Sequence, residues 1–152
     1  MNRIIILGNE EELIPLASTI NEDYCNKQAD VIMYNDQNIG TKTSSENLFL
    51  IGHASAKGIG DYPYTDLVKF FGDHLKGASK AVYLSGCSTQ SEAAQILKNG
   101  FVPKTLAANV KQYTKKTVWG TPGVLVLIND SVLSVEVPLS SGYKTTDIFI
   151  QA

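Results

Sequence analysis

Two short segments of the chain each consist of an apolar run that ends at a glycine followed directly by a reactive side chain. Residues 47–53 end in Gly52 and His53, and residues 80–87 end in Gly86 and Cys87. A thiol close to an imidazole is a nucleophile paired with a base, because the imidazole lowers the thiol pKa or removes its proton. These residue types therefore predict nucleophilic catalysis by Cys87, with His53 as general base, wherever the fold brings them together.

The same stretch of sequence also predicts the strands and the helix that would position this pair. Each apolar run has the length and composition of a strand buried on both faces of a parallel sheet. Residues 64–77 between them have the apolar spacing of a crossover helix, so the two strands are expected to be neighbours about 5 Å apart in one βαβ unit. Because chemistry in open parallel sheets collects at the carboxyl ends of the strands, we expect His53 and Cys87 at one edge.

The order strand, Gly-His, helix, strand, Gly-Cys resembles the catalytic core of the caspase-like cysteine peptidases. This group includes caspases, legumains, gingipains, clostripain and the self-cleaving domains of large bacterial toxins. Cys87 follows His53 by 34 residues, a shorter distance than the roughly 50 residues of caspases, and Ser85-Gly86-Cys87-Ser88 looks most like the toxin domains. The resemblance covers about residues 1–128. It implies a cysteine endopeptidase that cuts a peptide or protein substrate, as a bacterial effector or a self-processing protease.

The resemblance also implies where the rest of the catalytic site lies. The backbone N–H groups of Ala54 and Cys87 would form the oxyanion hole, although family members usually have glycine where this chain has Ala54, whose methyl group restricts φ. Substrate would contact Ser85, Trp119, Gly120 and Thr121. The competing interpretation is that Trp119 only fills the core and that residues 120–123 only turn the chain. Asp61 and Asp66 would give an acidic pocket for a basic side chain, or they are simply a loop acid and a helix-start residue.

A basic segment follows the cysteine motif. Between Ala93 and Asn129 there is no acidic residue, whereas Lys98, Lys104, Lys111, Lys115 and Lys116 are present. Such a segment in an acidic protein can hold a polyphosphate or an acidic partner. The toxin domains are activated by inositol hexakisphosphate, so the resemblance implies a polyphosphate activator. The alternative is that these lysines are the solvated faces of two helices.

Composition narrows the class of protein. The 152 residues, 43% of them hydrophobic, are enough for one core, so we expect a single domain over residues 1–152. A net charge of −2 gives no signal for nucleic acid or a membrane surface. One histidine and one cysteine are too few to ligate a metal, and no organic cofactor is implied. Without a signal-peptide pattern at residues 1–8, we expect a cytoplasmic protein or one exported without a classical signal.

The rest of the sequence predicts an α/β fold: a doubly wound, mostly parallel sheet flanked by helices, as in the caspase-like proteins, with a C-terminal hairpin or edge strands. Asn9 is expected to cap a helix over residues 10–24, with Glu12 completing a capping-box-like arrangement. His74, inside the crossover helix, is expected at the surface or an interface. The other predicted strands are 3–8, 29–34, 116–119, 124–128, 132–139 and 145–151, with helices at 89–99 and 103–113 and a hairpin loop at 129–131.

Two other functions stay open on the sequence alone. A non-catalytic caspase-like binding or scaffold protein would keep the His53 and Cys87 pair without a working oxyanion hole, and Ala54 favours it. A flavodoxin-like nucleotide or phosphate binder is disfavoured, because Leu7-Gly8-Asn9-Glu10 is not a glycine-rich phosphate loop.

Overall fold

The computed structural model describes residues 1–54, 58–86, 105–121, 124–128, 131–136, 144–146 and 149–152. Its centre is a six-stranded sheet with the strand order β11-β7-β6-β3-β1-β2. Five strands are parallel to one another, and the edge strand β11 pairs antiparallel with β7. The strands are β1 (Arg3–Ile6), β2 (Asp30–Met33), β3 (Ser45–Ile51), β6 (Ala78–Ser85), β7 (Thr117–Gly120) and β11 (Ile150–Gln151).

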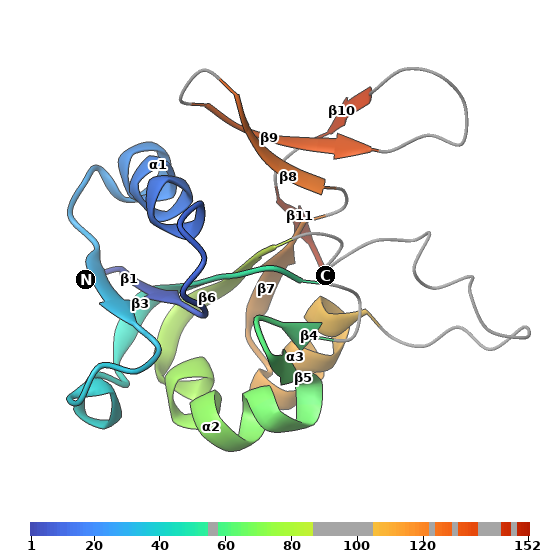
Figure 1. The fold of residues 1–152 in the computed structure, drawn as a ribbon. Coiled ribbons are helices and arrows are strands. Elements are labelled where there is room, and N and C mark those ends of the chain that lie inside the picture. Colours follow the sequence, from blue (N-terminus) through green and yellow to red (C-terminus); the bar gives the residue numbers. More distant parts are fainter. Residues whose placement is uncertain (55–57, 87–104, 122–123, 129–130, 137–143, 147–148) are drawn as a thin grey trace, which may run out of the picture.

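Helices cover both faces of this sheet. The helix α1 (Leu13–Cys25) lies over one face, and α2 (Tyr64–Gly77) and α3 (Leu106–Thr114) lie over the other (Figure 1). A single 3₁₀ turn, η1 (Ile39–Thr41), lies between β2 and β3 in the chain. The prediction of a doubly wound, mostly parallel α/β sheet flanked by helices is confirmed.

The buried strands explain why the sequence folds this way. All four residues of β1 are buried, as are the last four of β3, so both strands pack on two faces. Alternate residues enter different cores: Ile5 and Leu50 belong to the core under α2 and α3, whereas Ile4 and Phe49 belong to the core under α1. The period-2 alternation of side chains along a strand produces this division.

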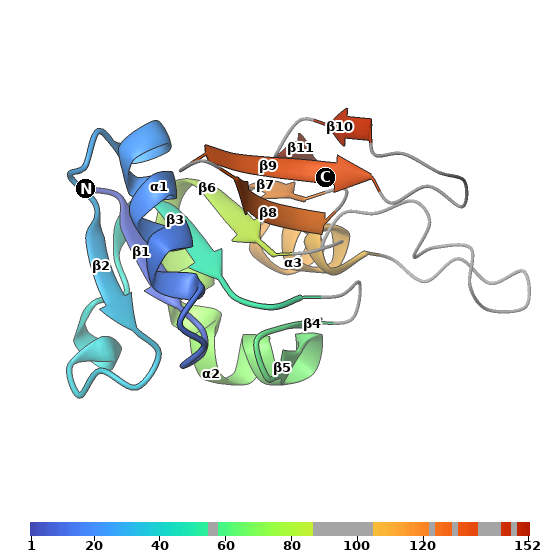
Figure 2. The ribbon, with the colours of Figure 1, turned by 45° about the horizontal axis from the view of Figure 1, so that its top comes forward.

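Two smaller sheets complete the fold. The strands β8 (Val124–Ile128), β9 (Ser131–Glu136) and β10 (Lys144–Thr146) form an antiparallel sheet in the order β10-β9-β8, which is seen beside α1 in Figure 2. This sheet and β11 confirm the predicted C-terminal hairpin and edge strand. The strands β4 (Gly58–Ile59) and β5 (Tyr62–Pro63) form a hairpin that the sequence analysis missed. The predicted helix over residues 89–99 lies outside the described residues, as do residues 129 and 130 of the predicted loop.

A row of aromatic rings crosses three adjacent strands on the α1 side. Phe49, Tyr83 and Trp119 are register partners on β3, β6 and β7. The Phe49 and Tyr83 rings stack with centroids 4.3 Å apart, and the Tyr83 and Trp119 rings stack at 6.0 Å. Burial raises the pKa of Tyr83, so its hydroxyl stays protonated at neutral pH. Trp119 is thus part of the packing of the sheet.

Two local predictions are wrong. The helix α1 begins at Leu13, and Glu12 occupies its N-cap position without a side-chain capping bond, whereas the Asn9 side chain donates a hydrogen bond to the Tyr34 hydroxyl at 3.0 Å. His74 is buried, with its Nε2 2.8 Å from the carbonyl oxygen of Ile39, because the α2 face that carries it packs against the segment around η1. Within the described ranges, every helix is too short or too polar to cross a membrane.

Candidate functional site: an acidic pocket at the carboxyl edge of the sheet

The chain leaves the sheet in opposite directions at the carboxyl ends of β1 and β3. These strands are neighbours with Ile6 opposite Ile51, and the N–H of Leu7 donates to the carbonyl of Ile51 at 2.7 Å. After β1 the chain continues into α1 on one face, and after β3 it reaches α2 on the other (Figure 1). This is the switch point at which open α/β sheets hold their ligands.

The β4–β5 hairpin folds back over this edge. Its turn residue Gly60 has φ = +60°, and its N–H donates to the carbonyl of His53 at 2.6 Å. A side chain at this position would place its Cβ 2.5 Å from the carbonyl oxygen of Leu7, so only glycine allows so close an approach. The next residue, Asp61, is thereby brought beside the end of β1.

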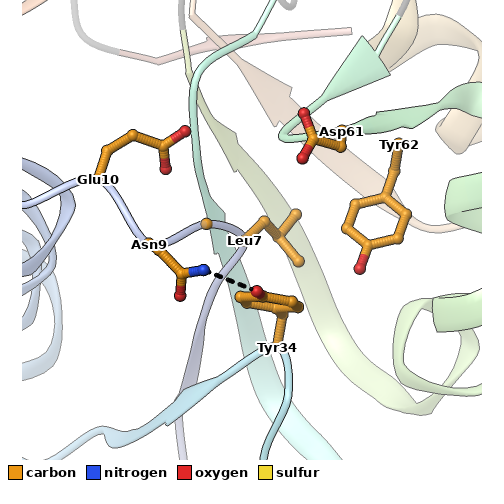
Figure 3. Close-up of a pocket in the computed structure, with 7 residues that line it drawn as sticks. Leu7, Asn9, Glu10, Tyr34, Asp61 and Tyr62 are labelled. Atoms are coloured by element: carbon orange, nitrogen blue, oxygen red, sulfur yellow. Dashed lines mark hydrogen bonds between the residues drawn. The ribbon is translucent and has the colours of Figure 1, made fainter.

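A pocket of about 330 Å³ opens between the loop after β1, the end of β2 and this hairpin (Figure 3). Glu10 lies on one side of Leu7 and the Asp61 carboxylate on the other, with the rings of Tyr34 and Tyr62 below them in the view of Figure 3. The hydrogen bond from Asn9 to the Tyr34 hydroxyl ties the first loop to the end of β2. The pocket is lined by Leu7, Gly8, Asn9, Glu10, Tyr34, Asp61 and Tyr62.

The charge of this pocket is negative. Glu10 and Asp61 are both exposed, no basic side chain lines the pocket, and within the described ranges neither carboxylate forms an ion pair. Burial raises the pKa of Tyr62, and the neighbouring Tyr34 and Asp61 raise it further. The Tyr62 hydroxyl can therefore act as a neutral hydrogen-bond group beside two carboxylates.

A second, open pocket of about 480 Å³ lies on the other side of the same turn. It shares Asp61 and Tyr62 with the first pocket and adds His53, Ala54, Gly58, Gly60 and Pro63. The His53 imidazole lies against Glu12 at the start of α1, with Nε2 2.7 Å from Oε1. The pKa of Glu12 is lowered, first by a hydrogen bond from its own backbone N–H and then by the hydrogen bond with His53.

The structure describes one residue of the predicted His53 and Cys87 pair. His53 is exposed at the end of β3 and contacts Glu12, whereas Cys87 lies outside the described residues. Ala54 forms an isolated β-bridge with Ile59 at the base of the hairpin. Ser85 and Thr121 are fully buried and line neither pocket of the carboxyl edge. Gly120 is buried in β7 opposite Leu84.

The predicted basic segment is divided by the fold. Lys111 and Lys115 line an open pocket of about 490 Å³ with Ala108 and Gln112, and Lys111 Nζ donates to the carbonyl of Ala152 at 2.7 Å. The Lys116 ammonium donates to the carbonyls of Lys76 and Ala78 instead. Lys98 and Lys104 lie outside the described residues. Polyphosphate binding by these lysines stays a prediction.

Comparison with known proteins shows a likeness to a solved structure. No family model matches the chain, and no curated protein does. Among solved structures, the solution structure of two-electron reduced flavodoxin from Megasphaera elsdenii matches with a TM-score of 0.48 and 20% identity, over 82% of this chain and 85% of that one. A likeness of this size concerns the fold alone.

The predicted identity as a caspase-like cysteine endopeptidase is wrong: the similar solved structure is a flavodoxin and not a peptidase. The predictions that depended on this identity, thiol-protease activity and a toxin or effector role, are corrected with it. Gly-His and Gly-Cys after buried strands do not by themselves identify a peptidase. Polar residues at the carboxyl ends of such strands occur in many unrelated functions.

The carboxyl edge does not fit a phosphate group. In doubly wound sheets a mononucleotide can sit at this switch point, with its phosphate on main-chain N–H groups at a helix N-terminus. Here the loop that leads to α1 carries Glu10, Glu11 and Glu12 in succession, and their carboxylates would repel a phosphate dianion. The same charges favour a cation.

Most of this pocket was not predicted from the sequence. Asp61 was considered for an acidic pocket, but Asn9, Glu10, Tyr34 and Tyr62 had no predicted role in a site. A usable signal exists for the hairpin, because Gly60-Asp61 between Ile59 and Tyr62 is a two-residue turn of the type that needs positive φ at its first residue. No comparable signal places Tyr34 beside Asn9, since their hydrogen bond depends on the pairing of β1 with β2.

Proposed function

We propose that this chain is a ligand-binding protein whose carboxyl-edge pocket takes an organic cation, a primary ammonium or guanidinium group. The observation that supports it is one pocket that holds two tyrosines and two carboxylates, Glu10 and Asp61, which form no ion pair with any described residue. Carboxylates give charge-assisted hydrogen bonds to such groups. Aromatic faces attract a cation through the ring quadrupole.

The charges around the pocket also favour a positively charged ligand. Glu11 follows Glu10 directly and is also exposed. His53, which lines the neighbouring pocket, contacts Glu12. An anionic ligand, including a nucleic acid, would be repelled here. A cytoplasmic location, or export without a classical signal, is kept as part of this proposal and is tested by cell fractionation.

Calorimetric titration tests the proposal with n-butylammonium and ethylguanidinium as probes and 1-butanol as the uncharged control. We expect the cations to bind with a dissociation constant of about 1 mM, equivalent to about −4 kcal/mol, and 1-butanol not to bind. Raising the salt concentration should weaken binding, because both carboxylates are exposed.

Two variants locate the site. Asp61→Asn and Glu10→Gln should each weaken the binding of ethylguanidinium by about fivefold or more, since each removes a charge-assisted hydrogen bond. Asp23→Asn, an exposed carboxylate at the far end of α1, makes the same change in net charge and should leave binding nearly unchanged. Equal losses in all three variants would mean that the probe responds to net charge and not to this pocket.

A further inference from the structure

An exposed aromatic residue extends the carboxyl edge beyond the pocket. Phe70 on the outer face of α2 is 58% exposed. Its ring contacts the ring of Tyr62, with centroids 6.0 Å apart, and Tyr62 lines both pockets of the edge. The fold does not require an apolar residue here, because the buried face of α2 is supplied by Leu67, Phe71 and Leu75.

Acidic residues flank this ring. Asp66 and Asp73 are four residues before and three residues after Phe70, so they lie on the same face of α2. Within the described ranges, no ion pair engages Asp61, Asp66 or Asp73. Among the described residues, the basic group at this ring is that of Lys69, whose ammonium lies 5.4 Å from the ring centroid on a long, flexible side chain.

We infer that the cation of the pocket is an arginine or lysine side chain of a partner protein, and that an apolar side chain of the same segment rests on Phe70. This inference rests on the proposed function of the pocket. The carboxylates of Glu10, Asp61, Asp66 and Asp73 are complementary in charge to a basic segment, and this indicates the kind of partner. A free amine would leave Phe70, Asp66 and Asp73 without a role.

The distance between the two aromatic rings of this surface determines how far apart the partner's two contacting residues should be. Residues two apart in an extended segment point to the same side, roughly 7 Å from one another. The Tyr62 and Phe70 rings are 6.0 Å apart. The surface therefore fits an extended segment in which the basic residue and the apolar residue are separated by one other residue.

Short peptides test this spacing by calorimetric titration. The probes are acetyl-Arg-amide, acetyl-Arg-Gly-Leu-amide, acetyl-Arg-Gly-Ser-amide and acetyl-Glu-Gly-Leu-amide. We expect the Arg-Gly-Leu peptide to bind about tenfold more tightly than the Arg-Gly-Ser peptide, because its leucine removes apolar surface from water on Phe70. The Glu-Gly-Leu peptide should not bind.

A matched pair of variants assigns the gain to Phe70. Phe70→Ser should abolish the tenfold advantage of the leucine peptide and leave the binding of acetyl-Arg-amide unchanged. Ile14→Ser is the control, because Ile14 is also on a helix and is 60% exposed, but it lies on α1 across the sheet. Circular dichroism should show both variants folded, since both side chains project from helix surfaces.

The outcomes separate the two proposals. No advantage for leucine, or an advantage that survives Phe70→Ser, overturns the inference, and the pocket stands if acetyl-Arg-amide still binds. Failure of every arginine probe overturns the proposed function itself. Sedimentation that shows a dimer lost in Phe70→Ser would assign the surface to a second copy of this chain, which also overturns the inference.

Discussion

The acidic carboxyl edge and the basic end of α3 carry opposite charges, and they differ in what those charges contact. At the basic end, Lys111 donates to the carbonyl of Ala152. Lys116 donates to the carbonyls of Lys76 and Ala78, where α2 ends and β6 begins. At the acidic edge, Glu10 and Asp61 have no basic partner within the described ranges. The lysines at the basic end form hydrogen bonds within the fold, whereas the carboxylates at the acidic edge are available to a ligand.

The largest effect should come from the turn that holds the acidic edge in place. Gly60→Ala puts a methyl group 2.5 Å from the carbonyl oxygen of Leu7 at a residue with φ = +60°. We expect the free energy of unfolding in urea to fall by about 3 kcal/mol, because backbone strain and a steric clash act together. Binding of ethylguanidinium should weaken as well, since Asp61 follows directly in the chain.

Gly40→Ala is the control for this change. A Cβ at Gly40 would meet no atom within 4 Å, so its free energy of unfolding should change by less than about 1 kcal/mol. If Gly60→Ala were as stable as the Gly40 variant, the hairpin would not be pinned to β1 and Asp61 would be free to move.

The next effect tests whether charge at the basic end belongs to the fold. Lys116→Met removes the ammonium that binds two main-chain carbonyls, and we expect the free energy of unfolding to fall by about 2 kcal/mol. Lys115→Met, which removes the same charge from an exposed neighbour, should cost much less. Equal losses in urea denaturation would remove the contrast between the two regions.

The opposite result is expected at the acidic edge. The double variant Glu10→Gln with Asp61→Asn should change the free energy of unfolding by no more than about 0.5 kcal/mol, because neither carboxylate has a basic partner among the described residues. Its binding of ethylguanidinium should be abolished. A marked loss of stability would show that these carboxylates serve the fold, and the acidic edge would then resemble the basic end.

The sequence predicts the sheet better than it predicts the site. Residues 3–6 and 48–51 form uninterrupted buried runs, and burial on both faces is a local property that a single strand reveals. The pocket instead joins three distant segments, represented by Glu10, Tyr34 and Asp61. Their meeting depends on β1 lying between β2 and β3, and no local pattern encodes that order.

The same limit explains the error at the start of α1. Asn9 and Glu12 have the spacing of a capping box, but both side chains have partners outside the helix. Asn9 donates to Tyr34, 25 residues away, and Glu12 contacts His53, 41 residues away. Tertiary contacts at the switch point thus override a local pattern, and a single sequence does not carry this information.

The smallest effect concerns the one carboxylate of this edge that does have a basic partner. Contact with its own backbone N–H and with His53 lowers the pKa of Glu12 in the folded protein. A lowered pKa in the folded state means that ionised Glu12 stabilises the fold above its unfolded pKa of about 4.3. That contribution is lost as the pH falls through the lower folded value.

Glu12→Gln should therefore reduce the melting temperature slightly at pH 7, and the difference from the wild type should shrink as the pH is lowered toward 3. Glu11→Gln removes a neighbouring carboxylate, so subtracting its effect corrects for the general change in charge. The expected effect is small because Glu12 and His53 are both exposed to solvent. A difference that grows at acid pH would have the wrong sign for a carboxylate held ionised by the fold. Glu12 would then resemble Glu10 and Asp61, whose charges are not expected to stabilise the fold.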